Sequence, residues 1–142
     1  MRTRTHERGS TSVFAVIVAA VLMALAGLCI DGGKVLNARA TLTDTAEQAA
    51  RAGAQEISVG SMRGATRISL DTAAARTSAA RHLTASGISV DSFTVATTGQ
   101  EVVVTLEEDV PTTMLRIVGV DSVHVSATGN ARAAVGINQE ES

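Results

Sequence analysis

Residues 7–33 read ERGSTSVFAVIVAAVLMALAGLCIDGG, a charged flank followed by an apolar block that ends abruptly at Asp31. From Ser12 to Ile30 there are nineteen residues, and none of them is charged. An α-helix rises about 1.5 Å per residue, so this block is roughly 28 Å long as a helix, close to the hydrocarbon thickness of a bilayer. Its ten Leu, Ile, Val and Phe residues favour insertion by roughly 3–6 kcal/mol. The block predicts a transmembrane helix over residues 12–30.

The charges before the block predict its orientation. Residues 1–11 form a basic leader with Arg2, Arg4 and Arg8, against a single acid, Glu7. Because positively charged flanks stay on the cytoplasmic side, we expect the N-terminus inside and the rest of the chain outside the cytoplasmic membrane. Membrane lipid is therefore an expected partner.

Processing within the block is the alternative to a permanent anchor. Ala24–Ala26 resembles a small-x-small signal-peptidase site, and cleavage there would release a secreted chain that begins at Gly27. However, Leu28, Cys29 and Ile30 continue the apolar run beyond that point. A lipoprotein site requires a small residue before the cysteine, and here that residue is a leucine. We therefore prefer a retained single-pass anchor.

Composition narrows the classes of function. The 142 residues include two aromatic residues and one cysteine, so the core must come from aliphatic side chains and no intrachain disulfide can form. Residues 31–142 carry nine Lys or Arg and thirteen Asp or Glu, a formal net charge of −4. Without a basic stripe or stacking aromatics, nucleic acid is not an expected partner.

Residues 31–57 are predicted to form an amphipathic helix after the anchor. At 100° per residue one arc collects small and apolar residues: Val35, Ala38, Leu42, Ala46, Ala49, Gly53 and Ile57. This face suits close backbone approach, and we expect it to pack on its own domain, with helices of neighbouring subunits as the alternative. Between the two helical segments, Asp31, Gly32 and Gly33 predict a hinge or break, or an N-cap at Asp31.

Residues 58–142 are predicted to form an extracytoplasmic α+β head. A polar loop at 59–67 precedes a helix over residues 69–87, with Ser69 or Asp71 as its N-cap and Gly87 at its C-terminal end. The apolar period then changes to two, which predicts about three antiparallel strands, over residues 93–97, 102–111 and 120–135, with a short helical connection at 112–119. The predicted fold class is α+β: a transmembrane helix continuing into an amphipathic helix, a second helix and a small sheet.

Catalytic and metal-binding patterns are not found in the sequence. His6, His82 and His124 have no cysteine or acid at metal-ligand spacing. There is no nucleophile elbow, no Ser-x-x-Lys and no phosphate-binding glycine loop. The acidic run at residues 107–109 is interpreted as a solvated edge that deters strand addition, rather than as a cation site. We expect a protein that is not an enzyme, with no cofactor, no metal and no small-molecule substrate.

Three segments carry a resemblance to a known family. Arg8-Gly9-Ser10 precedes the apolar helix, Ala-Gly-Leu-x-x-Asp closes it, and Asp-x-Ala-x-x-Ala-Ala-x-Ala-Gly-Ala runs from Asp44 to Ala54. Over residues 8–57 the chain thereby resembles the TadE/TadG-like proteins of the tight-adherence (Flp-type) pilus system. The positions that carry the family pattern are Asp31, Gly32, Asp44, Ala46, Ala49, Ala50 and Gly53.

The resemblance implies a minor pilin or pseudopilin that helps to assemble a pilus or the associated secretion machinery. Its implied partners are other pilin-like subunits and the Tad assembly machinery. Family pseudopilins are cut by a prepilin peptidase after a glycine, with a glutamate five residues later. Gly9 matches that glycine and makes Ser10 the first mature residue, but Phe14 stands in place of the glutamate. The alternative class is a secreted or anchored envelope binding module, an adhesin or a sensor.

Overall fold

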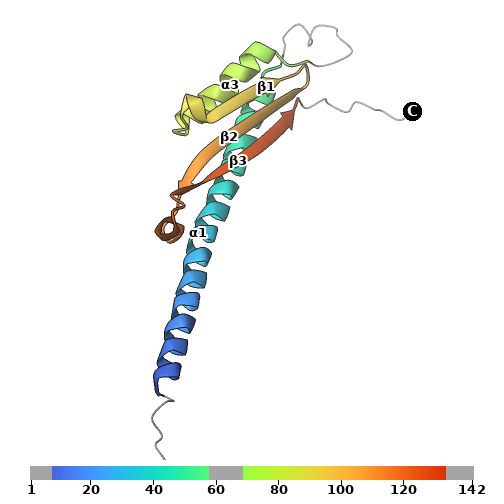
Figure 1. Ribbon diagram of the computed structural model, residues 1–142. Helices are drawn as coiled ribbons and strands as arrows, with labels where there is room; N and C mark the ends of the chain where they lie inside the picture. The colour runs from blue at the N-terminus through green and yellow to red at the C-terminus, as the bar shows by residue number, and fades with distance from the viewer. Residues whose placement is uncertain (1–7, 58–68, 134–142) are drawn as a thin grey trace, which may run out of the picture. The chain divides into compact units, whose positions relative to one another are not determined.

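The elements of the computed structural model, which describes residues 8–57 and 69–133, confirm the α+β class (Figure 1). A long N-terminal helix is followed by a second helix and a three-stranded antiparallel sheet. In chain order the elements are α1 (Arg8–Ala54), α3 (Thr72–Ala85), η1 (Val90–Ser92), β1 (Phe93–Thr97), β2 (Glu101–Pro111), η2 (Leu115–Val118) and β3 (Ser122–Arg132). The expected polar loop at 59–67 lies outside the described residues.

The chain divides into two compact units. The first comprises residues 1–36 and 110–123, which include the apolar block and η2. The second comprises residues 37–109 and 124–142, which include the C-terminal part of α1, α3 and most of the sheet.

Helix α1 is continuous over 47 residues, so the prediction of a hinge or break at Gly32 and Gly33 is wrong. Each glycine costs a helix about 1 kcal/mol relative to Ala, which is not enough to interrupt a helix with good helix formers on both sides. The Asp31 side chain does not cap the helical segment that follows it in sequence either, because it accepts hydrogen bonds from amides of the distant residues 113–115. The two predicted helical segments are therefore one element.

Replacing Gly33 by alanine is expected to stabilise α1 by about 1 kcal/mol, because a Cβ there meets no atom within 4 Å and alanine is the better helix former. Thermal unfolding of the full chain in detergent, followed by circular dichroism, measures the change. Gly53→Ala is the matched control in the same helix, and it should destabilise. A lower melting temperature for Gly33→Ala would mean that the helix requires a glycine at that position.

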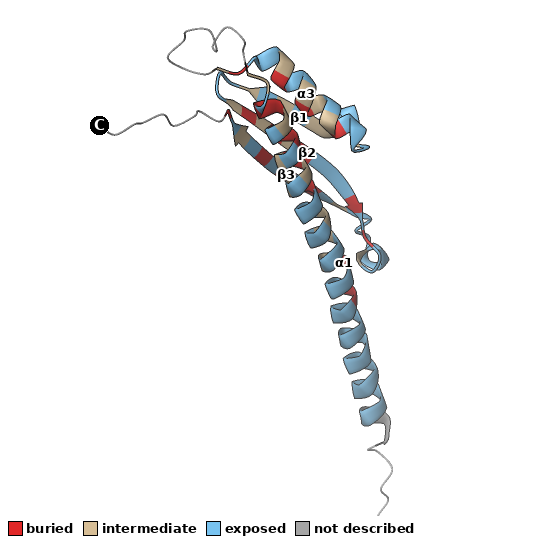
Figure 2. Ribbon diagram, turned by 180° about the vertical axis from the view of Figure 1, so that it is seen from behind, coloured by how far each residue is buried: buried red, intermediate tan, exposed pale blue. Residues whose placement is uncertain are grey.

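In the first unit, the apolar block of α1 is exposed (Figure 2). Of residues 11–30, Gly27 alone is buried. Large apolar side chains such as Phe14 (68% exposed) and Leu22 (60% exposed) therefore have little protein packed on them. Among the described residues, α1 is the one helix long and apolar enough to cross a membrane.

In the second unit, the predicted small-residue face of α1 is buried. Ala46 and Ala49 are fully buried, and Gly53 is so close to its neighbours that a Cβ would lie 2.8 Å from the Ala75 carbonyl oxygen. The expectation that this face packs on its own domain is confirmed. Among the described residues of the unit, the other fully buried apolar ones are Ala50, Ala75, Ala79, Leu83, Val102, Val104 and Leu106.

Helix α3 begins and ends with the predicted caps. Asp71, rather than Ser69, is the N-cap, and its carboxylate accepts hydrogen bonds from the Ala73 and Ala74 N–H groups at 3.2 and 3.0 Å. Gly87 follows the helix with φ +83°, in the left-handed region that a helix-terminating glycine adopts readily.

The three strands are ordered β1-β2-β3, so β2 is central. Strands β1 and β2 pair antiparallel from Phe93 opposite Leu106 to Thr97 opposite Val102, and the chain turns at the predicted Thr98–Gln100. Alternate β2 residues are buried, which is the pattern expected of a sheet with one face on the core. The strand predictions are confirmed.

Candidate functional site

The carboxylate of Asp31 is the most unusual polar group of the first unit. The residue is 1% exposed, although it ends an apolar block whose side chains are exposed. Its Oδ1 accepts a hydrogen bond from the Thr113 N–H at 2.7 Å, and its Oδ2 accepts from the N–H groups of Met114 and Leu115 at 2.8 and 2.7 Å. These lengths are typical of charge-assisted hydrogen bonds.

These three amides lie at the start of η2, where N–H groups have no partner within the helix. The N-cap residue of η2 is Met114, whose side chain makes no capping hydrogen bond. Asp31 therefore supplies, from a different element, the acceptor that a local Ser, Thr, Asn or Asp normally provides. Its negative charge also suits a helix N-terminus.

Hydrogen bonding keeps Asp31 ionised. The bond from the Leu115 N–H is the largest cause that lowers the pKa of this carboxyl, while burial opposes it. The N–H groups of Thr113 and Met114, and the positive charge of Lys34, lower the pKa further. The group that receives the three N–H donors is thus a carboxylate at neutral pH.

Neighbouring residues fix the same loop in the first unit, residues 112–121. Lys34, three residues after Asp31 on α1, donates a hydrogen bond to the Thr113 hydroxyl. Thr112 closes the base of the loop, because its N–H and its hydroxyl both donate to the Asp121 carbonyl, at 3.0 and 3.1 Å. Gly119, with φ +90°, ends η2. The loop is therefore held at both of its ends.

Gly27, one helical turn before Asp31, is a further α1 residue that contacts this loop, through the Met114 side chain. A Cβ built on Gly27 would lie 2.6 Å from the Cβ of Met114, so any larger residue would displace the Met114 side chain. Gly27 and Asp31 are four residues apart and so lie on one face of α1. We call Gly27, Asp31 and the amides of residues 113–115 the Asp31 clamp. It gives a structural reason for the Ala-Gly-Leu-x-x-Asp pattern.

The other predicted site residues lie elsewhere. Gly9 and Ser10 are in the first turn of α1. Asp44 is exposed on α1 in the second unit. Ala46 and Gly53 are buried there, as are Ala49 and Ala50, and they form part of one core. Gly32, beside Asp31, has no atom within 4 Å of an added Cβ. Of the pattern positions, Asp31 thus belongs to the clamp and the buried small residues of α1 belong to the core, whereas Gly32 and Asp44 belong to neither.

The partners of Asp31 are not predicted by the sequence patterns. The sequence pattern predicts a helical connection at residues 113–115 without a contact to α1, and Gly27 enters only as the residue after a cleavage site and as part of the Ala-Gly-Leu-x-x-Asp pattern. Two features of the sequence allow the contact without specifying it: an acid directly after an apolar block, and a short helix with Met114, which cannot cap, at its start.

The histidines and acids form no metal site in the part of the chain that the structure describes. His124 is exposed on β3, with Nδ1 3.0 Å from Asp109 Oδ1 and Nε2 3.9 Å from Glu107 Oε2. The acids at 107–109 are exposed and follow Leu106, the last β2 residue paired with β1. They therefore lie where β2 has no β1 partner, which agrees with a solvated edge. His6 lies outside the described residues.

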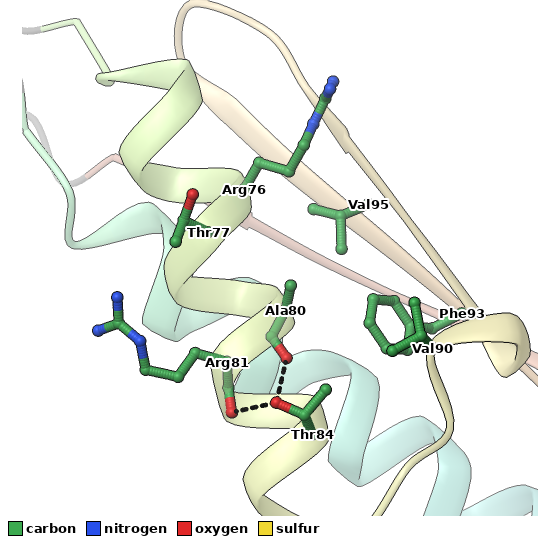
Figure 3. Close-up of a pocket in the computed structure, with 8 residues that line it drawn as sticks. All are labelled: Arg76, Thr77, Ala80, Arg81, Thr84, Val90, Phe93 and Val95. Carbon is green, nitrogen blue, oxygen red and sulfur yellow. Dashed lines mark hydrogen bonds between the residues drawn. The ribbon is translucent and has the colours of Figure 1, made fainter.

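A groove of about 590 Å³ in the second unit also lacks catalytic groups (Figure 3). Its lining comes from α3 and from the segment around β1, and consists of Arg76, Thr77, Ala80, Arg81, Thr84, Val90, Phe93 and Val95. The Thr84 hydroxyl donates to the carbonyl oxygens of Ala80 and Arg81, both at 3.1 Å. Because the lining contains no acid, histidine or cysteine, it offers no general base.

Comparison with known proteins finds a family match in the N-terminal part of the chain. No curated protein and no solved structure matches it. One family model does match, over residues 9–56, a range that contains the apolar block, Gly27, Asp31 and the buried small residues of α1. This is a family of pilus-assembly components and not a class of enzymes. Residues 9–56 match the family described as "Putative Flp pilus-assembly TadE/G-like". This match confirms the family resemblance noted in the sequence.

Proposed function

We propose that the chain is a minor pilin or pseudopilin, a non-catalytic subunit that acts in Tad/Flp-type pilus assembly or the associated secretion. The observation that carries the proposal is the family match, which covers both the exposed apolar block and the buried half of α1. The long exposed apolar surface supports anchoring, since a soluble protein rarely leaves so large an apolar surface uncovered.

The proposed organisation follows from the anchor. Residues 1–11 are the cytoplasmic leader, residues 12–30 cross the cytoplasmic membrane, and residues 58–142 form the extracytoplasmic head. Residues 31–57 connect them as the amphipathic part of α1. Other pilin-like subunits and the Tad machinery are the proposed partners, with membrane lipid around the block.

Cleavage between Gly9 and Ser10 is the proposed processing step. This is the position that the family resemblance implies, and the family match includes both residues. Phe14 takes the place of the glutamate that registers neighbouring pseudopilins, so the chain lacks the carboxylate that would meet a neighbour's new N-terminus. We therefore propose a role in initiating or assisting assembly rather than as the major filament subunit.

The N-terminus of the native protein tests this proposal. We expect the intact mass and N-terminal sequence of the membrane fraction to show a chain that begins at Ser10. A chain in the membrane that retains its leader would support the anchor but contradict processing. A chain in the medium that begins at Gly27 would contradict the anchor and favour the envelope binding module. In the native host, deleting the gene should abolish surface pili, and unchanged piliation would overturn the assembly role.

A further inference from the structure

The loop at residues 112–121 carries apolar side chains that the first unit leaves uncovered. Ile117 is 81% exposed and Val118 is 75% exposed, and both belong to η2. Met114, which is 37% exposed, lies beside them, and Val120 of the same loop is 41% exposed. Single exposed apolar residues are common on proteins, but a contiguous set marks a surface that is covered by something else.

This surface is continuous with the apolar block of α1. A groove of about 310 Å³ lies between η2 and the block within the first unit. Its lining is entirely apolar and consists of Ala20, Met23, Ala24, Leu28, Met114, Leu115, Ile117 and Val118. The Asp31 clamp holds η2 in this position through its amides and through the contact of Met114 with Gly27.

The position of the groove along α1 determines how deep the groove would lie in the membrane. At about 1.5 Å per residue, Leu28 lies about 3 Å and Ala20 about 15 Å before Ile30 along the helix axis. Both residues are within the proposed membrane span, residues 12–30. A bilayer that covers this span would therefore meet Ile117 and Val118 beside residues 20–28, at the level of its acyl chains.

The backbone of the loop suits an apolar environment. Irregular backbone at membrane depth is tolerated only where its polar groups have partners. Asp31 accepts from the amides of residues 113–115, and the Asp121 carbonyl accepts from Thr112. The N–H groups of residues 117, 119 and 120 donate to carbonyls of the loop itself. The loop also carries two charged side chains, Arg116 and Asp121, which are 69% and 84% exposed with Arg116 Nε 4.0 Å from Asp121 Oδ1. The long Arg116 side chain can extend toward lipid phosphates.

We propose that this loop inserts Ile117 and Val118 among the acyl chains of the membrane that α1 spans, which gives the protein a second lipid contact. The inference rests on the proposed membrane anchor. The proposed insertion also assigns a role to the Asp31 clamp. Its carboxylate holds η2 against the membrane-spanning block and supplies acceptors for amides that would otherwise be unpaired in lipid. Lipid is the favoured occupant because the exposed surface continues that of the span itself.

Spin labels on the full chain in vesicles test the insertion. The background is Cys29→Ser, which removes the one native cysteine, and single cysteines are introduced as Ile117→Cys, Leu22→Cys and Val90→Cys. All three native side chains are exposed, at 81%, 60% and 68%, so the labels should not disturb packing. Leu22 is the control within the span, and Val90 is the control in the second unit. Vesicles of phosphatidylethanolamine and phosphatidylglycerol are prepared at high and low lipid-to-protein ratios.

We expect the label at 117 to match the label at 22, with high collision rates with oxygen and a collision rate with a water-soluble nickel chelate severalfold lower than at 90. If the chelate reaches 117 but not 22, the loop does not insert, although the anchor stands. If it reaches both, the proposed anchor fails as well. Protection of 117 from both reagents, with spin–spin broadening that dilution with lipid removes, would identify a neighbouring chain as the occupant and overturn the lipid contact.

Discussion

Replacing Gly129 by alanine is expected to destabilise the second unit by about 3 kcal/mol, the upper end of the usual cost of overpacking a core. Gly129 lies in β3, and a Cβ built on it would be 2.3 Å from the Glu47 nitrogen and 2.4 Å from the Ala46 carbonyl carbon. Both are backbone atoms of α1, so no side-chain rotation relieves the contact. Either the helix or the strand must move.

The sign of this prediction is opposite to that expected from local preference. In the interior of a strand, alanine is favoured over glycine by roughly 0.5–1 kcal/mol, since glycine loses more backbone entropy on folding. Gly99→Ala is the matched control, because a Cβ there meets no atom within 4 Å and its φ is not positive. Chemical denaturation of both variants measures the free energy of unfolding. A Gly129→Ala protein as stable as the native one would contradict the close contact between β3 and α1.

Local sequence patterns were sufficient to predict most elements of the second unit. The 3.6-residue period identified the buried face of α1, and the two-residue period identified the strands. Asp71 and Gly87 marked the ends of α3 because capping depends on residues close in sequence. The periods report which face is buried, but not how closely two backbones approach. The contact at Gly129 was therefore not predictable.

The Asp31 clamp was not predictable for a related reason. Its hydrogen-bond donors are 82 to 84 residues away in the sequence, and a backbone amide carries no residue-specific pattern. Locally, an acid followed by two glycines favours a helix break, and that interpretation was wrong. The family pattern singled out Asp31 and Gly32 without a reason, and the structure provides one for Asp31 through the loop that it holds.

Replacing Asp31 by alanine is expected to release the loop at residues 112–121 while leaving the second unit folded. The substitution leaves three amide N–H groups without an acceptor, and the segment should then open far more often. Hydrogen exchange of the full chain in detergent measures this opening. We expect exchange at residues 113–115 to accelerate about 10- to 100-fold, in line with the loss of hydrogen bonds to a charged group. Asp44→Ala, which removes an exposed acid from the same helix, should leave that exchange unchanged.

The asparagine variant separates hydrogen bonding from the mere presence of a side chain. Asp31 Oδ2 accepts from Met114 and Leu115, and Oδ1 accepts from Thr113. In Asp31→Asn one of these oxygens becomes an NH₂ group, a donor that faces a donor, and the negative charge is lost. The exchange rate should therefore lie between those of the native protein and Asp31→Ala. If alanine and asparagine both left the exchange at residues 113–115 unchanged, the loop would be held by Thr112 and Gly27 instead, and the carboxylate would have no part in the clamp.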